Sequence, residues 1–173
     1  PDIADDMGCS AAEALARLYE GFDAQLVITG MAQEDVDRIS AAPTVAIASD
    51  GSSLRSTGPL SAGKPHPRSY GTFPRFLSMV RETNLVSLEE AIRKMTSLPA
   101  ERLKLTRRGR LSPGQFADVV VFDSNEVRDV ATFESPHEYS EGINHVLVNG
   151  TVVVSDGKPT GKRPGRVLRS STE

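Results

Sequence analysis

The chain has 173 residues and a mass of 18.6 kDa, a length that suits one domain or slightly more. Its 38% hydrophobic and 25% charged residues predict a folded protein rather than a disordered one, and 5% aromatic residues leave the core mainly to aliphatic side chains. The net charge of -3 and the pI near 5.7 provide no general attraction to nucleic acid or to an anionic membrane, so we expect neither as a partner.

The compartment is predicted from what the sequence does not contain. No run approaches the roughly 20 consecutive apolar residues of a membrane-spanning helix, and the first residues show no charged-then-apolar leader. The single cysteine, Cys9, excludes an internal disulfide and a zinc site built from cysteines, and it suits a reducing compartment. We therefore expect a soluble, cytoplasmic protein.

The first third of the chain is predicted to alternate helix and strand. Ser10 and Glu13 have the spacing of a capping box, so a helix should begin there and end near Gly21. Apolar runs at 26–28 and 44–48 predict strands, with a short helix over 34–40 between them. Both runs lack polar alternation, which is typical of a parallel sheet in an α/β protein.

The middle third is predicted to hold a long loop and then helices. Residues 51–71 are rich in Gly, Ser and Pro without an apolar period, and loops of that length are usually functional or disordered. Thr72 is the expected cap of the next helix, with Pro74 in its first turn. A second capping box at Ser87 and Glu90 predicts another helix, and Pro99 should restart a short one.

The last third is predicted to be rich in β-strand. An apolar strand is expected over 117–122, and strands at 146–148 and 151–154 flank Asn149-Gly150, the preferred pair for a type I′ hairpin turn. Asp156-Gly157 predicts a further turn. The basic end of the chain is interpreted as a solvated tail rather than a nucleic-acid site, since it has no aromatic residues for stacking; its cations are Lys158, Lys162, Arg163, Arg166 and Arg169.

Asp50 is the first candidate for chemistry. It directly follows the predicted strand 44–48, and reactive groups of parallel α/β folds gather at the carboxyl ends of strands. The alternative is that Ser49-Asp50-Gly51 is only a turn, because the same tripeptide recurs at Ser155-Asp156-Gly157 in an evident turn. The tripeptide alone does not decide between the two interpretations.

The three histidines show no pairing at a metal-ligand spacing. His66-Pro67-Arg68 lies in the long loop, where Arg68 could offer its planar fork of donors to a carboxylate, although the bare tripeptide favours simple solvent exposure. His137 and His145 are interpreted as surface or hairpin residues. No phosphate-binding glycine loop, nucleophile elbow or catalytic cysteine context is present, so Cys9 is expected to be inert.

A longer pattern includes His-Pro-Arg at 66–68, Gly-Thr-Phe-Pro-Arg at 71–75 and Gly-x-x-Ala-Asp-x-Val-x-Phe-Asp at 114–123. This pattern resembles the N-acyl-D-amino-acid deacylases of the metal-dependent amidohydrolase superfamily. The first two motifs are much more specific to that branch, whereas the third is shared by many amidohydrolases. The resemblance covers residues 30 to 169. The matching segments are 46–51, 65–68, 70–75, 87–96, 114–123, 131–133, 139–143, 148–150 and 164–169.

The resemblance implies an α/β fold, with the C-terminal part of a (β/α)8 TIM-barrel amidohydrolase domain over 1–108 and strands of a small β-sandwich over 109–173. It implies an enzyme that uses Zn²⁺ to hydrolyse the amide bond of an N-acyl-D-amino acid. Asp50 matches the aspartate that serves as general base and acid and that also contributes to metal binding. Arg68 matches the arginine expected to hold the α-carboxylate of the substrate, whereas no role is implied for His66.

The sequence also departs from the deacylase pattern. The metal-binding His-x-His of the family, its cysteine and two further histidines are absent from this chain, and Cys9 falls outside the matching position. We therefore expect a C-terminal portion that needs the missing N-terminal part of the barrel as its partner and that is inactive alone. The alternatives are another amidohydrolase, dihydroorotase-like or dipeptidase-like, and a non-catalytic free-standing module.

Overall fold

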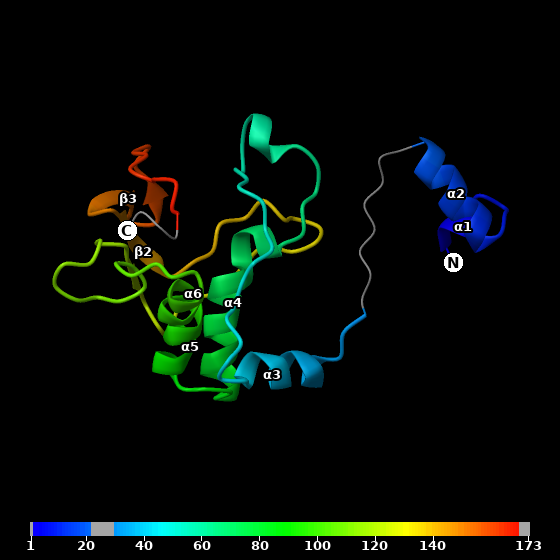
Figure 1. The fold of residues 1–173 in the computed structure, drawn as a ribbon. Coiled ribbons are helices and arrows are strands. Elements are labelled where there is room, and N and C mark those ends of the chain that lie inside the picture. The colour runs from blue at the N-terminus through cyan, green and yellow to red at the C-terminus, as the bar shows by residue number, and fades with distance from the viewer. Residues whose placement is uncertain (1, 22–29, 170–173) are drawn as a thin grey trace. The chain divides into compact units, whose positions relative to one another are not determined.

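The computed structural model describes residues 2–21 and 30–169 (Figure 1). The chain divides into two compact units, residues 1–33 and residues 34–173, and each is described by itself. Among the described residues, no helix combines the length and the apolar content needed to cross a membrane. The described residues form helices and one small antiparallel sheet.

The first unit contains two helices, α1 (Asp2–Asp6) and α2 (Ala11–Gly21). The Ser10 hydroxyl accepts a hydrogen bond from the backbone N–H of Glu13 at 3.2 Å, which satisfies one of the unpaired amides at the start of α2. The cap predicted from the sequence is therefore confirmed. The strand predicted at 26–28 lies outside the described residues.

The helix α3 (Gln33–Ala41) confirms the helix predicted over 34–40. The strand predicted over 44–48 is wrong, because Thr44 lies in a turn and residues 45–48 belong to no strand. A parallel strand needs a neighbouring strand for its ladder, and the backbone N–H of Ile47 instead donates to the carbonyl of Lys94 at 3.1 Å. The parallel β-α-β unit is therefore absent from the described part of the chain.

The central helix is α4 (Arg68–Thr83), preceded by the 3-10 turn Pro59–Ser61. The predicted start at Thr72 is wrong, because α4 begins at Arg68 and Pro74 lies inside it. Pro74 has no N–H to donate to the Tyr70 carbonyl one turn earlier. The Ser140 hydroxyl donates to that carbonyl at 3.1 Å, so the missing helical bond is replaced from another segment.

Two short helices follow, α5 (Leu88–Met95) and α6 (Ser97–Arg102). The second predicted cap is confirmed, since the hydroxyl of Ser87 accepts from the backbone N–H of Glu90 at 3.2 Å. Pro99 lies in the first turn of α6, where a missing N–H costs no helical bond.

The sheet has the order β1-β2-β3-β4, with antiparallel neighbours throughout. Its strands are β1 (Val119–Phe122), β2 (Ile143–Val148), β3 (Thr151–Ser155) and β4 (Lys158–Pro159). Asn149 and Gly150 have φ values of 48° and 76°, as a type I′ turn requires, which confirms the predicted hairpin. Asp156 and Gly157 repeat this geometry between β3 and β4, with φ values of 50° and 72°.

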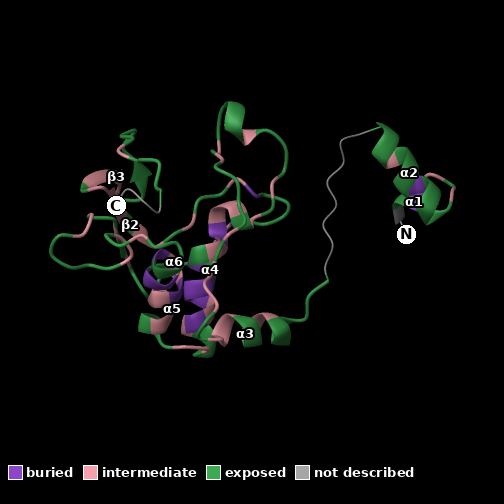
Figure 2. Cartoon of the chain, in the orientation of Figure 1, coloured by how far each residue is buried: buried purple, intermediate pink, exposed green. Residues whose placement is uncertain are grey.

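The core of the second unit joins the helices to the sheet-bearing part of the chain. The residues buried on α4 and α5 appear in purple in Figure 2, on the sides where these helices approach each other. Partly buried side chains from the extended segment before Asp50 and from β1 and β2 pack against them. The buried members of this cluster are Phe76, Leu77, Val80, Ala91 and Val127.

Candidate active site

The two residues predicted to carry chemistry, Asp50 and Arg68, meet in the structure. An Nη2 atom of Arg68 lies 2.8 Å from Oδ2 of Asp50, although the whole loop 51–67 separates them in sequence. The side chains are 85% exposed for Asp50 and 45% exposed for Arg68. An exposed pair of this kind contributes little to stability. Its interest therefore lies in the chemistry of the two adjacent groups.

Asp50 is held in a left-handed backbone conformation, with φ of 48°. The hydroxyl of Ser49 accepts a hydrogen bond from the N–H of Gly51 at 3.2 Å, which closes the local turn. A Cβ atom on Gly51 would lie 2.7 Å from the Cα atom of Ser69, closer than real contacts allow. The absence of a side chain at position 51 thus lets Asp50 approach the first turn of α4.

Arg68 is the first residue of α4, and His66 lies directly before this turn. Nδ1 of His66 accepts a hydrogen bond from the backbone N–H of Arg68 at 3.0 Å. The imidazole also meets the ring of Phe133 edge to face, with centroids 4.9 Å apart. Burial, and then the positive charge of Arg68, lower the pKa of His66 below its ordinary value.

The long loop between Asp50 and Arg68 is attached to the segment that contains His137 and Tyr139. Nε2 of His137 lies 3.0 Å from the carbonyl oxygen of Gly63, and Nδ1 lies 3.0 Å from the hydroxyl of Tyr70. The hydroxyl of Tyr139 accepts from the backbone N–H of Ser56 at 3.3 Å. These contacts fasten the loop at two points inside it, Ser56 and Gly63.

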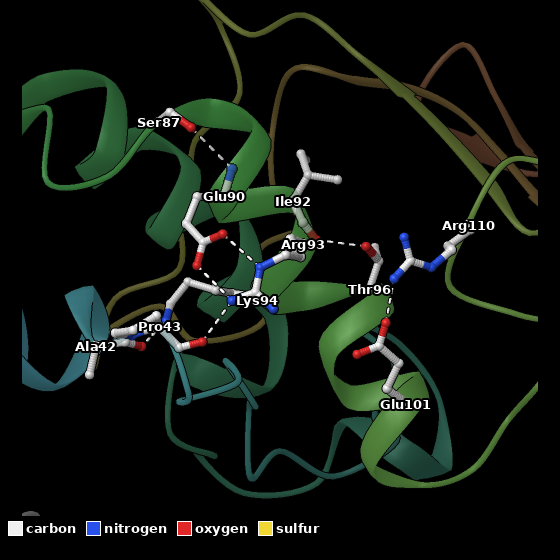
Figure 3. Close-up of polar contacts among 10 residues, drawn as sticks. All are labelled: Ala42, Pro43, Ser87, Glu90, Ile92, Arg93, Lys94, Thr96, Glu101 and Arg110. Carbon is white, nitrogen blue, oxygen red and sulfur yellow. Dashed lines mark hydrogen bonds and ion pairs between the residues drawn. The ribbon is translucent and has the colours of Figure 1, made fainter.

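The segment leading to Asp50 is hydrogen bonded to residues of α5 (Figure 3). The Lys94 ammonium donates to the carbonyl of Ala42, and the Arg93 guanidinium donates to the carbonyl of Pro43 at 2.6 Å. The backbone N–H of Ile47 returns a bond to the carbonyl of Lys94. Three bonds thus fix residues 42–47 shortly before Asp50.

Lys94 is the most unusual of these groups, because it is charged and its relative exposure is 0%. Burial lowers the pKa of its ammonium below the ordinary value, with the opposing charge of Glu90 raising it by a smaller amount and Arg93 lowering it further. Such a group is tolerated inside a protein when it is hydrogen bonded. The Ala42 carbonyl meets that condition.

The remaining sequence candidates lie elsewhere. Nδ1 of His145 accepts from the backbone N–H of Asp156 at 3.4 Å, in the turn between β3 and β4. Cys9 belongs to the first unit, where it is a free thiol of intermediate exposure. His145 makes its contacts in the sheet rather than with the Asp50–Arg68 pair.

The described residues contain no group of three or more His, Cys, Asp or Glu side chains that could hold a metal ion. A cavity of about 280 Å³ lies between α4, the start of α5 and β1, lined by residues such as Leu77, Asn84 and Phe122, and Asp50 and Arg68 are not among them. This cavity carries no candidate catalytic group, so we place the candidate site at the exposed ion pair instead. There, a carboxylate that can move a proton lies beside a guanidinium that can bind an anion.

Sequence reasoning missed the supports of this site. His137 was interpreted as a surface residue, yet it connects Tyr70 to the long loop. No pattern in the sequence indicated a role for Lys94, yet its ammonium binds the Ala42 carbonyl in the segment before Asp50. The sequence signal for Tyr139 is its place in the matching segment 139–143, and His137 lies two residues before that segment.

Comparison with known proteins identifies a family model and several close relatives. Residues 58–154 match the model described as "Amidohydrolase family". The chain is 43% identical over 169 residues to an N-acyl-D-glutamate deacylase of Alcaligenes xylosoxydans xylosoxydans, with 97% of this chain and 32% of the relative covered. It is also 43% identical over 169 residues to an N-acyl-D-aspartate deacylase of the same organism, with 96% and 32% covered.

Solved structures agree with these relatives. A D-aminoacylase crystal structure, described as defining a novel subset of amidohydrolases, matches with a TM-score of 0.84 and 41% identity, over 97% of this chain and 34% of that one. The N-acyl-D-glutamate deacylase of Bordetella bronchiseptica, complexed with zinc and a phosphonate inhibitor, matches with a TM-score of 0.77 and 41% identity, over 91% and 32%. The chain therefore spans about a third of the length of the relatives it matches.

Proposed function

Because the chain belongs to the amidohydrolase family, we propose that it forms part of a zinc-dependent enzyme that hydrolyses N-acyl-D-amino acids to a carboxylate and a free D-amino acid. In this proposal Asp50 is the general base and acid, and Arg68 binds the α-carboxylate of the substrate. The observation that supports it is the 2.8 Å contact between the two side chains.

The geometry of the substrate explains why this contact matters. In an N-acyl amino acid, the amide nitrogen and the carboxylate carbon are attached to the same Cα and lie about 2.5 Å apart, from standard bond lengths and angles. A group that gives a proton to that nitrogen and a group that binds that carboxylate must therefore be neighbours. Arg68 has five N–H donors, so it can hold a substrate carboxylate while it remains beside Asp50.

The proposed reaction needs one proton carrier. The oxygen of a water molecule attacks the carbonyl carbon of the amide while Asp50 accepts the proton that this water loses. The carbon–nitrogen bond then breaks, and Asp50 returns the proton to the leaving amine. Arg68 fixes the α-carboxylate throughout, which orients the scissile bond toward Asp50.

The described residues do not fit a complete zinc site, because they contain no group of three suitable side chains. The carboxylate of Asp50 would supply one ligand, and we propose that the others belong to protein outside this chain. When bound, zinc lowers the pKa of a coordinated water toward neutrality. The missing partner is then the N-terminal part of the barrel.

The architecture proposed for the complete enzyme follows the same relatives. We propose that residues 1–108 belong to the C-terminal part of the (β/α)8 barrel and residues 109–173 to the small β-sandwich. The four-stranded antiparallel sheet supports the second assignment, and the similarity to D-aminoacylase supports both. A cytoplasmic location is proposed from the single cysteine.

The test begins with the coding DNA upstream of the codon for Pro1. We expect an open frame that encodes a His-x-His motif, then a cysteine and two further histidines. The full-length product should hydrolyse N-acetyl-D-amino acids in preference to their L-enantiomers, lose activity on chelation and regain it with zinc. A product that binds no metal, or that hydrolyses only cyclic amides or dipeptides, would overturn the proposal in favour of a non-catalytic module or of another amidohydrolase.

A further inference from the structure

His66 has no part in the proposed reaction, yet its side chain is hydrogen bonded to the backbone N–H of Arg68. Its Nδ1 accepts the N–H of Arg68 at 3.0 Å, and its carbonyl accepts the N–H of Ser69 at 3.0 Å. The formal N-cap, Pro67, makes no side-chain cap bond. The imidazole therefore provides the side-chain acceptor that α4 otherwise lacks at its start.

The chemistry of this contact fixes the state of the ring. Nδ1 accepts a hydrogen bond only when it carries no proton, so the imidazole is neutral with its proton on Nε2. The lowered pKa of His66, caused by burial and by Arg68, agrees with that assignment. The edge-to-face contact with Phe133 at 4.9 Å, with an interplanar angle of 79°, fixes the ring plane.

Because His66 lies two residues before Arg68, its hydrogen bond affects where the Arg68 guanidinium lies. Pro67 stiffens the chain between the imidazole and Arg68, because its ring restricts φ, which is -51° here. Arg68 then extends from this first turn to within 2.8 Å of Asp50. A shift of the turn would move the guanidinium away from the place where an α-carboxylate must bind.

We propose that His66 is a positioning residue: its neutral imidazole holds the backbone of Arg68 so that the guanidinium lies beside Asp50 and takes the substrate carboxylate. This inference rests on the proposed function, because it requires Arg68 to bind that carboxylate. It predicts an effect on substrate binding rather than on the chemical step.

The experiment uses the full-length enzyme and two substrates, an N-acetyl-D-amino acid and its α-carboxamide. His66→Ala should raise KM for the carboxylate substrate roughly five- to tenfold, as expected for one lost hydrogen bond, with kcat within about twofold of the wild type. KM for the carboxamide should not change. His66→Asn should restore KM, because the Asn side-chain oxygen can take the place of Nδ1.

Two further variants complete the design. His66→Gln places its amide nearer the position of Nε2, so it should resemble His66→Ala, and the comparison of Asn with Gln answers the question even if His66→Ala fails to fold. His145→Ala is the matched control, because Nδ1 of His145 also accepts a backbone amide, that of Asp156. It should leave both kinetic constants unchanged.

Failure of this inference can be separated from failure of the proposed function by Arg68→Ala. If Arg68→Ala raises KM for the carboxylate substrate and the His66 variants do not, the positioning role is wrong. The same conclusion follows if His66→Asn behaves like His66→Ala, or if kcat falls with KM unchanged. If Arg68→Ala itself leaves KM unchanged, the proposed binding role of Arg68 fails first.

Discussion

The chain contains the tripeptide Ser-Asp-Gly twice, at 49–51 and at 155–157, and the two copies have different surroundings. The aspartates are alike in backbone and exposure, since Asp50 and Asp156 have φ values of 48° and 50° and exposed fractions of 85% and 87%. Asp156 belongs to a hairpin turn, where Nε2 of His145 lies 3.9 Å from its Oδ1. Asp50 lies 2.8 Å from the guanidinium of Arg68.

The difference lies in what each glycine approaches. A Cβ on Gly157 would have the Ile143 carbonyl as its nearest neighbour at 3.7 Å, whereas a Cβ on Gly51 would meet the backbone of Ser69 at 2.7 Å. Gly157 serves local turn geometry, with φ of 72°. Gly51 instead allows the turn at Asp50 to lie close to the backbone of Ser69, which is distant in sequence. The tripeptide sequence alone therefore cannot distinguish a turn from a candidate site. The distinction requires knowing which segment each glycine approaches.

The largest expected effect comes from removing the proton carrier. In the full-length enzyme, Asp50→Asn should lower kcat by a factor of about 10² to 10⁴, because an amide cannot accept the proton. Asp156→Asn is the matched variant and should leave kcat within twofold. Steady-state kinetics on an N-acetyl-D-amino acid measures both, and wild-type turnover in Asp50→Asn would remove Asp50 from the mechanism.

Lys94, which holds the segment before Asp50, should contribute strongly to the free energy of unfolding. Lys94→Ala removes a fully buried stem and its bond to the Ala42 carbonyl, so we expect a loss of about 3 kcal/mol in the free energy of unfolding. Lys94→Met keeps the stem and should lose about half as much. Urea unfolding measures this, with the exposed Lys162→Ala as control, and equal losses for Lys94→Ala and Lys162→Ala would contradict the role.

The two glycines provide a third test. Gly51→Ala should lower kcat/KM by roughly 10- to 100-fold, because the turn must move away from Ser69 and carry Asp50 with it. Gly157→Ala should leave kcat/KM unchanged and cost about 1 kcal/mol of stability through its positive φ. If kcat/KM falls equally in the two variants, the contrast between the two tripeptides is wrong.

The smallest expected effect is a pH dependence of binding. The pKa of His66 is lowered by burial and by Arg68, so Nδ1 remains an acceptor through neutral pH and loses that capacity as the pH falls through the lowered value. Arg68 is the charged group that acts on the ring, and Asp50 lies across the ion pair from Arg68.

Protonation of Nδ1 removes the acceptor for the Arg68 N–H and releases the turn that positions the guanidinium, so KM for the carboxylate substrate should rise a few-fold on the acid side. His66→Asn cannot titrate and should show a flatter profile of KM against pH over the same range. A profile of KM that is identical in the two proteins would assign the acid-side change to another group.

Local signals predicted the local structure well. Ser10 and Ser87 cap α2 and α5 as their spacing indicated, and Asn149-Gly150 forms the hairpin turn. These features depend on a few neighbouring residues. The resemblance proposed roles for Asp50 and Arg68, but neither composition nor spacing could show that the two side chains meet.

The failed predictions concern features that depend on distant residues. The start of α4 was placed too late because Pro74 is normally confined to a first turn, and only Ser140 makes its interior position acceptable. The strand at 44–48 was predicted from its apolar run, yet a strand also requires a neighbour. His137 and Lys94 were missed for the same reason, since their partners lie far along the chain.

The bond from Ser140 to the Tyr70 carbonyl has a consequence for the order of events during synthesis. The two residues are 70 positions apart, and the contact from Tyr139 to Ser56 spans 83. At 5–20 residues per second, the ribosome needs roughly 4 to 14 s to add 70 residues. Asp50 and Arg68 therefore leave the ribosome seconds before the segment that fastens their loop, and the site acquires these supports only after most of the chain has been made.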